Sequence, residues 1–414
     1  MKTTSLACAV TGALLLLNGT ANAAEWFATP KVSARAGYND NLTITTQPHS
    51  SVRELDVSPE VSFGRKTETS GITGQARIDA RRYWGQSGLN TNDRLLNLHM
   101  YDNAERMGWT LDGNITKNTT LQSELNDTGL VLQRTPRLSR SLSPGWNYLI
   151  SQKTQLKLGY RYQDVRYPDQ ATLVYQDYRI NAGTATLSHQ YTQRLQLFAT
   201  GSVTYYRTTK NQLPARGEFD AHYDTVQAGA SYAFSQTLNA TLSAGLRRST
   251  TTINTQNPVY ATTPFGPIFL GYGSPVDVTQ TGSGSVLNAS LQKQLQTGTL
   301  SANLSRNVQP TGYGGLVETD RLDLSGNHRL SVTFSESLDL SLYRTKAISS
   351  TATNLDRTFV RVEPALAWNM TRWWRLQGSY RYARQRYTNQ SETATQNAVY
   401  VTLAYTWPKI AVSR

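Results

Sequence analysis

The stretch VYVTLAYTW, residues 399–407, decides the fold class of this chain of 414 residues. Every odd-numbered position from Val399 to Trp407 holds a large apolar or aromatic residue, while three of the four even-numbered positions hold Thr or Ala. Successive side chains of a β-strand point to opposite faces, so a period of two predicts a strand with one apolar face.

The same alternation returns along the whole chain, in long segments. Clear examples are residues 55–63, 107–115 and 238–246, where apolar side chains alternate with polar residues or glycine. These segments span about 9–13 residues, which suits a tilted strand that crosses a membrane, whereas globular strands average about 5–6. A soluble β-sandwich also alternates, so strand length and the links between strands have to decide between the two.

Links of two kinds alternate between these segments. Short links are predicted at 65–70, 105–106, 151–154, 191–194, 235–237, 294–297, 331–334 and 370–372. Long polar links are predicted near 40–53, 85–93, 117–136, 165–177, 207–222, 250–281, 307–319, 345–356 and 386–395. Nine long and eight short links give about 18 strands. The pattern predicts an all-β fold, a transmembrane antiparallel up-and-down β-barrel with short periplasmic turns and long extracellular loops.

The N-terminal segment has the features of a secretion signal. Lys2 supplies a positive charge, Leu6–Leu17 is apolar, and Ala21-Asn22-Ala23 is a small-x-small cleavage pattern. We interpret residues 1–23 as a signal peptide and residues 24–414 as a β-barrel domain of a Gram-negative outer membrane. Beyond Ala23 no run approaches the roughly 20 apolar residues of a spanning helix, and a closed barrel is the other structure that satisfies its backbone in lipid.

Composition excludes several classes of protein. Charged residues make up 17% of the chain, the formal net charge is +13, and the only cysteine is Cys8. One cysteine rules out a disulfide framework, a Cys-ligated zinc site and a thiol enzyme. The five histidines are scattered, and no HExxH, G-x-S-x-G or P-loop motif is present. We therefore expect no enzyme activity, no cofactor and no metal, and export from the cytoplasm argues against a nucleic-acid partner.

Aromatic residues gather near the predicted strand ends. They are Trp84, Trp109, Trp146, Tyr148, Trp368, Trp373, Trp374 and Trp407. Amphipathic rings favour the headgroup level of a membrane, so this placement predicts the aromatic girdles of a barrel. The alternative is a set of core aromatics in a sandwich, which would not favour strand ends.

The polar face is rich in arginine and in carboxylates. The predicted lumen-lining basic residues are Arg35, Arg77, Arg81, Arg161, Arg247, Arg361, Arg375 and Arg381. The carboxylates on the same face are Glu54, Asp56, Glu60, Asp79, Asp112, Asp323, Asp339 and Glu363. A barrel of about 18 strands is wide enough to hold water, so the arginines predict a conduit favouring anionic or neutral polar solutes. The alternative is that they pair with lumen carboxylates or with lipopolysaccharide phosphates.

Two of the long links are unusual. The link 250–281 carries four prolines among aromatic residues, and the link 307–319 holds Pro310-Thr311-Gly312-Tyr313-Gly314-Gly315. The link 250–281 could fold inward as a constriction or cap the mouth, and the link 307–319 is an apolar-aromatic turn, but we predict ordinary surface loops for both.

An internal repeat supports the hairpin interpretation. Residues 142–167 align without gaps on residues 362–387, and both copies carry Pro, then Leu, then Tyr-Arg-Tyr, then Arg-Tyr. Ser58-Pro59 begins a partial third copy. Repeated hairpins fit a barrel wall that is made of one recurring unit.

Several short motifs resemble a known family. Gly37-Tyr38-Asn39-Asp40-Asn41-Leu42 is similar to the Tyr-x-Asp-Asn element of the porin-like outer-membrane barrels associated with exopolysaccharide gene clusters. The Ser-Pro hairpins, the Tyr-Arg-Tyr strands, and Ser305-Arg306 followed by Pro310-x-Gly312-x-Gly314 add to this resemblance. It implies the outer-membrane section of a polysaccharide-export translocon, above a periplasmic polysaccharide-export protein, and it brings no catalytic residue.

Two functions remain open from the sequence. The first is a channel for a secreted anionic or neutral polysaccharide, and the alternative is a general diffusion porin for small anionic or polar solutes. A third class, a lipid-modifying enzyme, would need a hydrolase pair on the outer face. Expected partners are the lipid bilayer with its lipopolysaccharide, the barrel assembly machinery and, for the first function, the periplasmic export protein.

Overall fold

The structure is a computed structural model that describes residues 24–46, 49–85, 87–127, 134–168, 175–209, 218–348, 356–388 and 392–413. The predicted signal peptide, residues 1–23, lies outside the described residues. No helix in the described part of the chain is long and apolar enough to cross a membrane.

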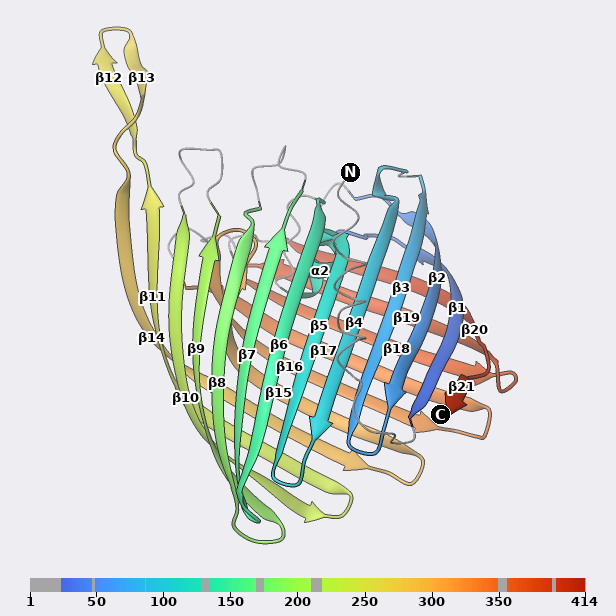
Figure 1. The fold of residues 1–414 in the computed structure, drawn as a ribbon. Helices are drawn as coiled ribbons and strands as arrows, with labels where there is room; N and C mark the ends of the chain where they lie inside the picture. Colours follow the sequence, from blue (N-terminus) through green and yellow to red (C-terminus); the bar gives the residue numbers. More distant parts are fainter. Residues whose placement is uncertain are drawn as a thin grey trace.

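Eighteen strands form one closed antiparallel barrel (Figure 1). They are β1 (Glu25–Asn39), β2 (Val52–Lys66), β3 (Ser70–Trp84), β4 (Thr91–Asn103), β5 (Met107–Thr119), β6 (Pro136–Ser151), β7 (Thr154–Arg166), β8 (Tyr178–Gln190), β9 (Leu195–Thr208), β10 (Phe219–Ser235), β11 (Leu238–Thr255), β14 (Val276–Gln294), β15 (Gly298–Thr311), β16 (Gly315–Arg329), β17 (Phe334–Ala347), β18 (Arg357–Asn369), β19 (Trp374–Tyr387) and β20 (Thr393–Thr406). Each strand pairs with the next one along the barrel, and β1 closes the barrel against β20, from Lys31 opposite Thr406 to Asn39 opposite Ala398. The predicted strand number and barrel class are confirmed.

Five further elements lie outside the wall of eighteen strands. They are η1 (Ser87–Leu89), α2 (Thr120–Asp127), the hairpin of β12 (Pro258–Thr263) and β13 (Gly266–Tyr272), and the short β21 (Ile410–Ser413). The chain after Trp407 continues along β1 in the direction of β20, and as β21 it pairs with the first residues of β1, where Ile410 lies opposite Ala28.

The strands are longer than expected, and two predicted long links are wrong. Strands run from 13 to 19 residues instead of about 9–13, and β11 and β14 occupy the two ends of the predicted link 250–281. The predicted link 307–319 consists of the ends of β15 and β16 joined by a turn at 312–314. Both segments are rich in Thr and Val, which favour strands even where the alternation of polarity has ended.

The apolar face of each strand points outward. Leu55 and Val57 on β2 are 36% and 38% exposed, whereas Glu54 and Asp56 between them are 4% and 5% exposed. This arrangement is the reverse of a soluble β-sandwich, in which the apolar face would be the buried one. The outside of the barrel is therefore suited to lipid and the inside to water.

Tryptophans on the outer face mark the short-turn end of the barrel. Trp109, Trp146, Trp368, Trp374 and Trp407 are all between 38% and 43% exposed there. Trp374 contacts Tyr405, and Tyr405 contacts Trp407, with ring centroids 4.8 and 4.6 Å apart. Such a belt is what the headgroup level of a bilayer favours.

Candidate functional site

The inner face of the first four strands carries a run of ion pairs. Arg35 on β1 lies 3.0 Å from Glu54 and 3.5 Å from Asp56 on β2. Arg81 on β3 lies 2.8 Å from Asp56 and 3.9 Å from Asp93 on β4. Because the strand register puts these residues side by side on one face, Asp56 meets arginines from both neighbouring strands.

The same run continues across the closing seam of the barrel. Arg381 on β19 donates to Glu363 on β18 at 2.9 Å. The Tyr400 ring on β20 lies 5.3 Å from the Arg381 guanidinium and 4.9 Å from the Arg35 guanidinium. We call the set from Glu363 to Asp93 the charged belt, and it crosses seven neighbouring strands, with the uncharged Tyr400 between Arg381 and Arg35.

The register places all eight predicted lumen arginines on the inner face. Beyond the belt, Arg77 lies 3.0 Å from Asp79, and Arg161 donates to Gln163 at 2.6 Å. Arg375 lines an inner-face cavity of 250 Å³ near the short turns. The structure thus brings three of the eight, Arg35, Arg81 and Arg381, into one network and leaves the others distributed around the wall.

The opposite part of the inner wall is neutral. The inner faces of β8, β9, β10, β14 and β15 carry no charged residue in the described chain, and hydroxyl and amide groups cover most of them. These groups bond to one another across strands: Thr186 to Thr200 at 2.9 Å, Thr241 to Ser231 at 3.0 Å, Asn288 to Gln227 at 2.9 Å, Ser301 to Ser325 at 2.6 Å and Asn327 to Thr299 at 2.6 Å. We call the inner faces of these five strands, β8, β9, β10, β14 and β15, the neutral sector.

The end of the β15–β16 hairpin, residues 307–319, leaves the wall and turns into the mouth of the barrel. We call it the mouth hairpin. The Tyr206 hydroxyl on β9 donates to the Thr311 carbonyl at 2.8 Å, and the Gln176 N–H donates to the Gly312 carbonyl at 2.7 Å. The turn thereby reaches β7–β9 past β10, β11 and β14, which lie between them in the wall.

Aromatic packing holds the mouth hairpin in this position. The hydroxyls of Tyr313 and Tyr175 are 3.1 Å apart, and Leu316 is fully buried among tyrosines of β7–β9. Gly314 has φ +78°, a left-handed conformation that glycine adopts without strain. A Cβ at Gly312 would lie 2.2 Å from the Tyr167 hydroxyl, so glycine is the residue that lets the turn approach this wall.

The segment between β1 and β2 also folds inward at the mouth. Ile44 is 2% exposed and packs against Tyr343, Phe359, Ala383 and Ala394 on the inner faces of β17–β20. The mouth is therefore narrowed from two sides.

A partly buried carboxylate lies beside Tyr167, one of the tyrosines that receive the mouth hairpin. Burial raises the pKa of Asp177, and the hydrogen bond that its carboxylate accepts from the Tyr167 N–H at 2.7 Å acts in the opposite direction.

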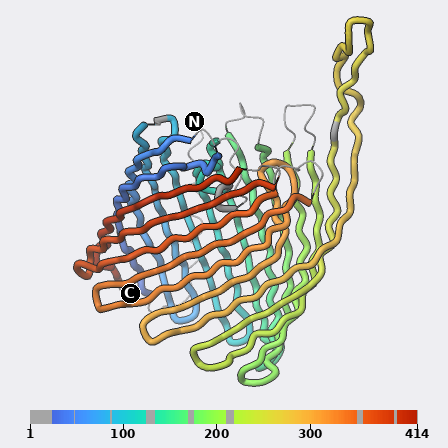
Figure 2. The backbone as a smooth tube through the Cα atoms, turned by 180° about the vertical axis from the view of Figure 1, so that it is seen from behind, coloured from blue at the N-terminus to red at the C-terminus, as the bar shows by residue number. Residues whose placement is uncertain are grey.

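The prediction of an ordinary surface loop is therefore wrong for the link 307–319. Residues 307–319 form a constriction, and the tyrosines that receive them were not among the predicted site residues. Residues 256–275 form an arm with β12 and β13 that rises away from the rim and does not enter the lumen (Figures 1 and 2). Sequence alone gave no signal for this difference, because both stretches are Pro-, Gly- and Tyr-containing segments.

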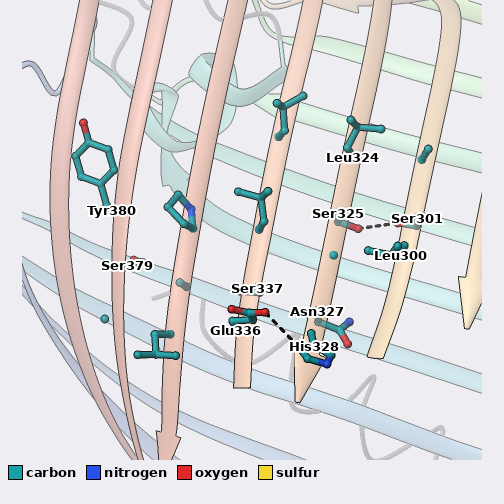
Figure 3. A pocket seen from close by; sticks show the side chains of 18 of the residues that line it. Leu300, Ser301, Leu324, Ser325, Asn327, His328, Glu336, Ser337, Ser379 and Tyr380 are labelled. Atoms are coloured by element: carbon teal, nitrogen blue, oxygen red, sulfur yellow. Dashed lines mark hydrogen bonds and ion pairs between the residues drawn. The ribbon is translucent and has the colours of Figure 1, made fainter. Parts of the chain in front are cut away.

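The outer face of β14–β20 carries a shallow apolar groove of 1120 Å³ (Figure 3). Leu300, Leu324 and Tyr380 project into it and are 49%, 40% and 42% exposed. Polar groups meet at its short-turn edge, where His328 and Glu336 form a 3.2 Å pair. An apolar outer surface with aromatic ends, around a closed and polar interior, defines a transmembrane β-barrel of the outer-membrane class.

Comparison with known proteins finds solved structures of similar fold and no match by sequence. No protein-family model matches the sequence, and no curated protein matches it. The fold is similar to Pseudomonas aeruginosa OpdK, with 10% identity over 92% of this chain and 99% of that chain and a TM-score of 0.43. It is also similar to Acinetobacter baumannii OccAB3, with 9% identity over 92% of this chain and 99% of that chain and a TM-score of 0.43. A third similar structure is the Escherichia coli K12 ferric-catecholate import receptor Fiu, with 10% identity over 92% of this chain and 81% of that chain and a TM-score of 0.46. At these identities the likeness concerns the barrel fold.

Proposed function

We propose that this protein is an outer-membrane channel for a hydroxyl-rich polymer, the outer-membrane section of an exopolysaccharide export system. The neutral sector is the observation that carries the proposal. Sugar hydroxyls both donate and accept hydrogen bonds, and the Ser, Thr, Asn and Gln groups of the sector offer the same two roles. Many weak and equivalent partners suit conduction, which requires entry without a site that holds the cargo.

The charged belt supports a neutral or weakly acidic cargo. Lys31, Arg35, Arg77, Arg81 and Arg381 each lie within 4.0 Å of a carboxylate. The electrostatic potentials of two paired opposite charges cancel beyond a short distance, so the belt does not attract small anions as isolated arginines would. This pairing argues against a diffusion porin for anions and agrees with the family resemblance to barrels of exopolysaccharide gene clusters.

Deletion of the gene tests the proposal in the cell. The expected result is loss of surface polysaccharide, with polymer retained in the periplasm and restored secretion on complementation with the intact gene. Uptake of small anions and sugars should be unchanged. Normal surface polysaccharide together with slowed solute uptake would instead identify a diffusion porin.

Variants of the neutral sector test the observation itself. Gln227→Leu with Asn288→Leu removes a linked pair of amides from the inner wall, and we expect secretion to fall several-fold at equal amounts of folded barrel. The matched control is Val226→Ala, which lies beside Gln227 on the outer face and is 70% exposed. Equal secretion from both variants would contradict a role for the sector.

A further inference from the structure

The barrel wall is incomplete between β14 and β15. These strands pair only from Leu287 opposite Arg306 to Gln294 opposite Thr299, although β14 begins at Val276. Residues 276–286 of β14 therefore pair with β11 along one edge and with no strand of the described chain along the other. We call this gap the notch, and in Figure 2 the strand that borders it, β14, rises together with β11 toward the hairpin arm.

The notch begins where the apolar outer band ends. On the outer face, Leu287 and Leu304 are followed toward the mouth by Ser285 and Arg306, and the Arg306 guanidinium pairs with Asp320 at 2.9 Å. Unpaired backbone inside the hydrocarbon layer would be prohibitively costly. Since the notch lies beyond that band, the mouth hairpin can change partners there without exposing its backbone to lipid.

The free edge of β14 offers the mouth hairpin a second set of partners. Continuing the observed register would put Asn307 opposite Val286 and Thr311 opposite Gly282. Residues 307–311 therefore have two possible places, the tyrosines of the mouth and the edge of β14. Pro310 has no N–H, which weakens the second pairing but does not prevent it. Two discrete packings of one element are the usual basis of a switch.

An ion pair holds the observed arrangement from the side of the notch. Arg247 on β11 is 5% exposed and lies 3.3 Å from Glu318 on β16. Its guanidinium crosses β14 at Gly284, where a Cβ would lie 2.5 Å from Nη2. The pair thus bridges the space that β15 would fill if it continued along β14.

We propose that the mouth hairpin is a gate. In the shut state seen here it lies across the mouth, held by Tyr175 and Tyr206 on one side and by the Arg247–Glu318 pair on the other. In the open state residues 307–311 pair with β14, which fills the notch and clears the mouth. The proposal rests on the channel function proposed above.

A reversible cross-link tests the shut state. Tyr175→Cys with Tyr313→Cys removes the hydroxyl contact and introduces two thiols into a chain whose only cysteine is Cys8. In planar bilayers we expect the reduced variant to be open most of the time. A short thiol-reactive disulfide-forming cross-linker should hold it at the low conductance level, and dithiothreitol should reverse the effect. Identical traces before and after cross-linking would show a static turn and overturn the gate.

The Arg247–Glu318 ion pair is tested without new cysteines. Glu318→Gln removes the charge that pairs with buried Arg247, and we expect the ratio of open to shut time to rise about tenfold. Asp320→Asn is the matched control, because Asp320 lies two residues away on β16 and pairs with exposed Arg306 instead. Both variants are first checked for the heat-dependent gel migration of a folded barrel.

The two proposals fail in different ways. Absence of any current from folded wild-type protein and from every variant would contradict the channel. Currents that are the same in wild type, Glu318→Gln and Asp320→Asn would leave the channel standing and exclude the gate.

Discussion

At the scale of single residues, the motif that carries the family resemblance fastens the barrel seam. The Asp40 carboxylate accepts from the Asn397 N–H at 2.7 Å and from the Asn397 amide at 2.8 Å. The Asn41 amide donates to the carbonyls of Thr45 at 2.8 Å and Thr395 at 2.9 Å. The Tyr-x-Asp-Asn element therefore ties the end of β1 to β20, where the barrel closes.

Asn41→Ala should weaken this seam. The substitution removes the buried Asn41 amide and leaves two part-buried carbonyls without this donor, and we expect it to lower the free energy of unfolding by about 1–3 kcal/mol. The measurement is the shift of the urea unfolding midpoint of the barrel refolded in detergent or lipid. Asn327→Ala, which removes one exposed bond to Thr299, is the control and should shift the midpoint less. Equal shifts of the midpoint in both variants would show that the Asn41 bonds do not stabilise the seam.

At the scale of elements, the internal repeat corresponds to three hairpins with the same irregularity. Strand pairing is interrupted at Pro59 in β2–β3, at Pro144 in β6–β7 and at Pro364 in β18–β19. Proline cannot donate to a ladder, so the same gap follows in each copy. Tyr160 donates to Asn181 and Tyr380 donates to Asn397, both at 2.7 Å, so the repeat also keeps its contact with the next strand.

The hairpin arm is expected to be dispensable for the barrel. In the described chain β12 pairs with β13 alone, and Phe265 and Leu270 are 100% and 64% exposed. Replacing residues 258–272 by a short Gly-Ser link should therefore leave barrel yield and heat-dependent gel migration unchanged. Loss of the folded form would show that the arm contributes to assembly. A deletion inside the paired part of β14, residues 287–294, serves as the control that should abolish folding.

At the scale of the whole molecule, the net charge of +13 gives a misleading picture of the lumen. The arginines of the belt are compensated by carboxylates on neighbouring strands, and the neutral sector adds no charge. We expect weak ion selectivity, with a reversal potential near zero in a KCl gradient. A strong anion preference of the wild-type protein would mean that unpaired arginines govern the lumen.

Glu363→Gln should convert this weak selectivity into anion preference. It removes the carboxylate that pairs with Arg381 and leaves that guanidinium facing the lumen. The reversal potential then moves toward the equilibrium potential of chloride. Glu336→Gln also removes one negative charge, but Glu336 lies on the outer face beside His328, so its reversal potential should stay at the wild-type value.

The sequence by itself determined the class of fold and, in the clearly alternating segments, the face of each side chain. A period of two is a local property, and nine residues such as 399–407 suffice to show which face meets lipid. The strand number followed in the same way, because the links could be counted along the chain. The sequence could also predict that Arg35, Arg81 and Arg381 lie on the inner face, since the face of a side chain depends only on its position along the strand.

Only the tertiary structure decided what the inner face does. Whether an arginine is paired depends on the register between strands, and Arg35 and Tyr400 are brought together by closure of the barrel alone. Residues 307–311 could pair with β14 or with tyrosines more than a hundred residues away in the chain, and both partners suit their composition. A choice between distant partners depends on how the whole barrel packs, so local alternation of side chains could not predict a turn that crosses the mouth.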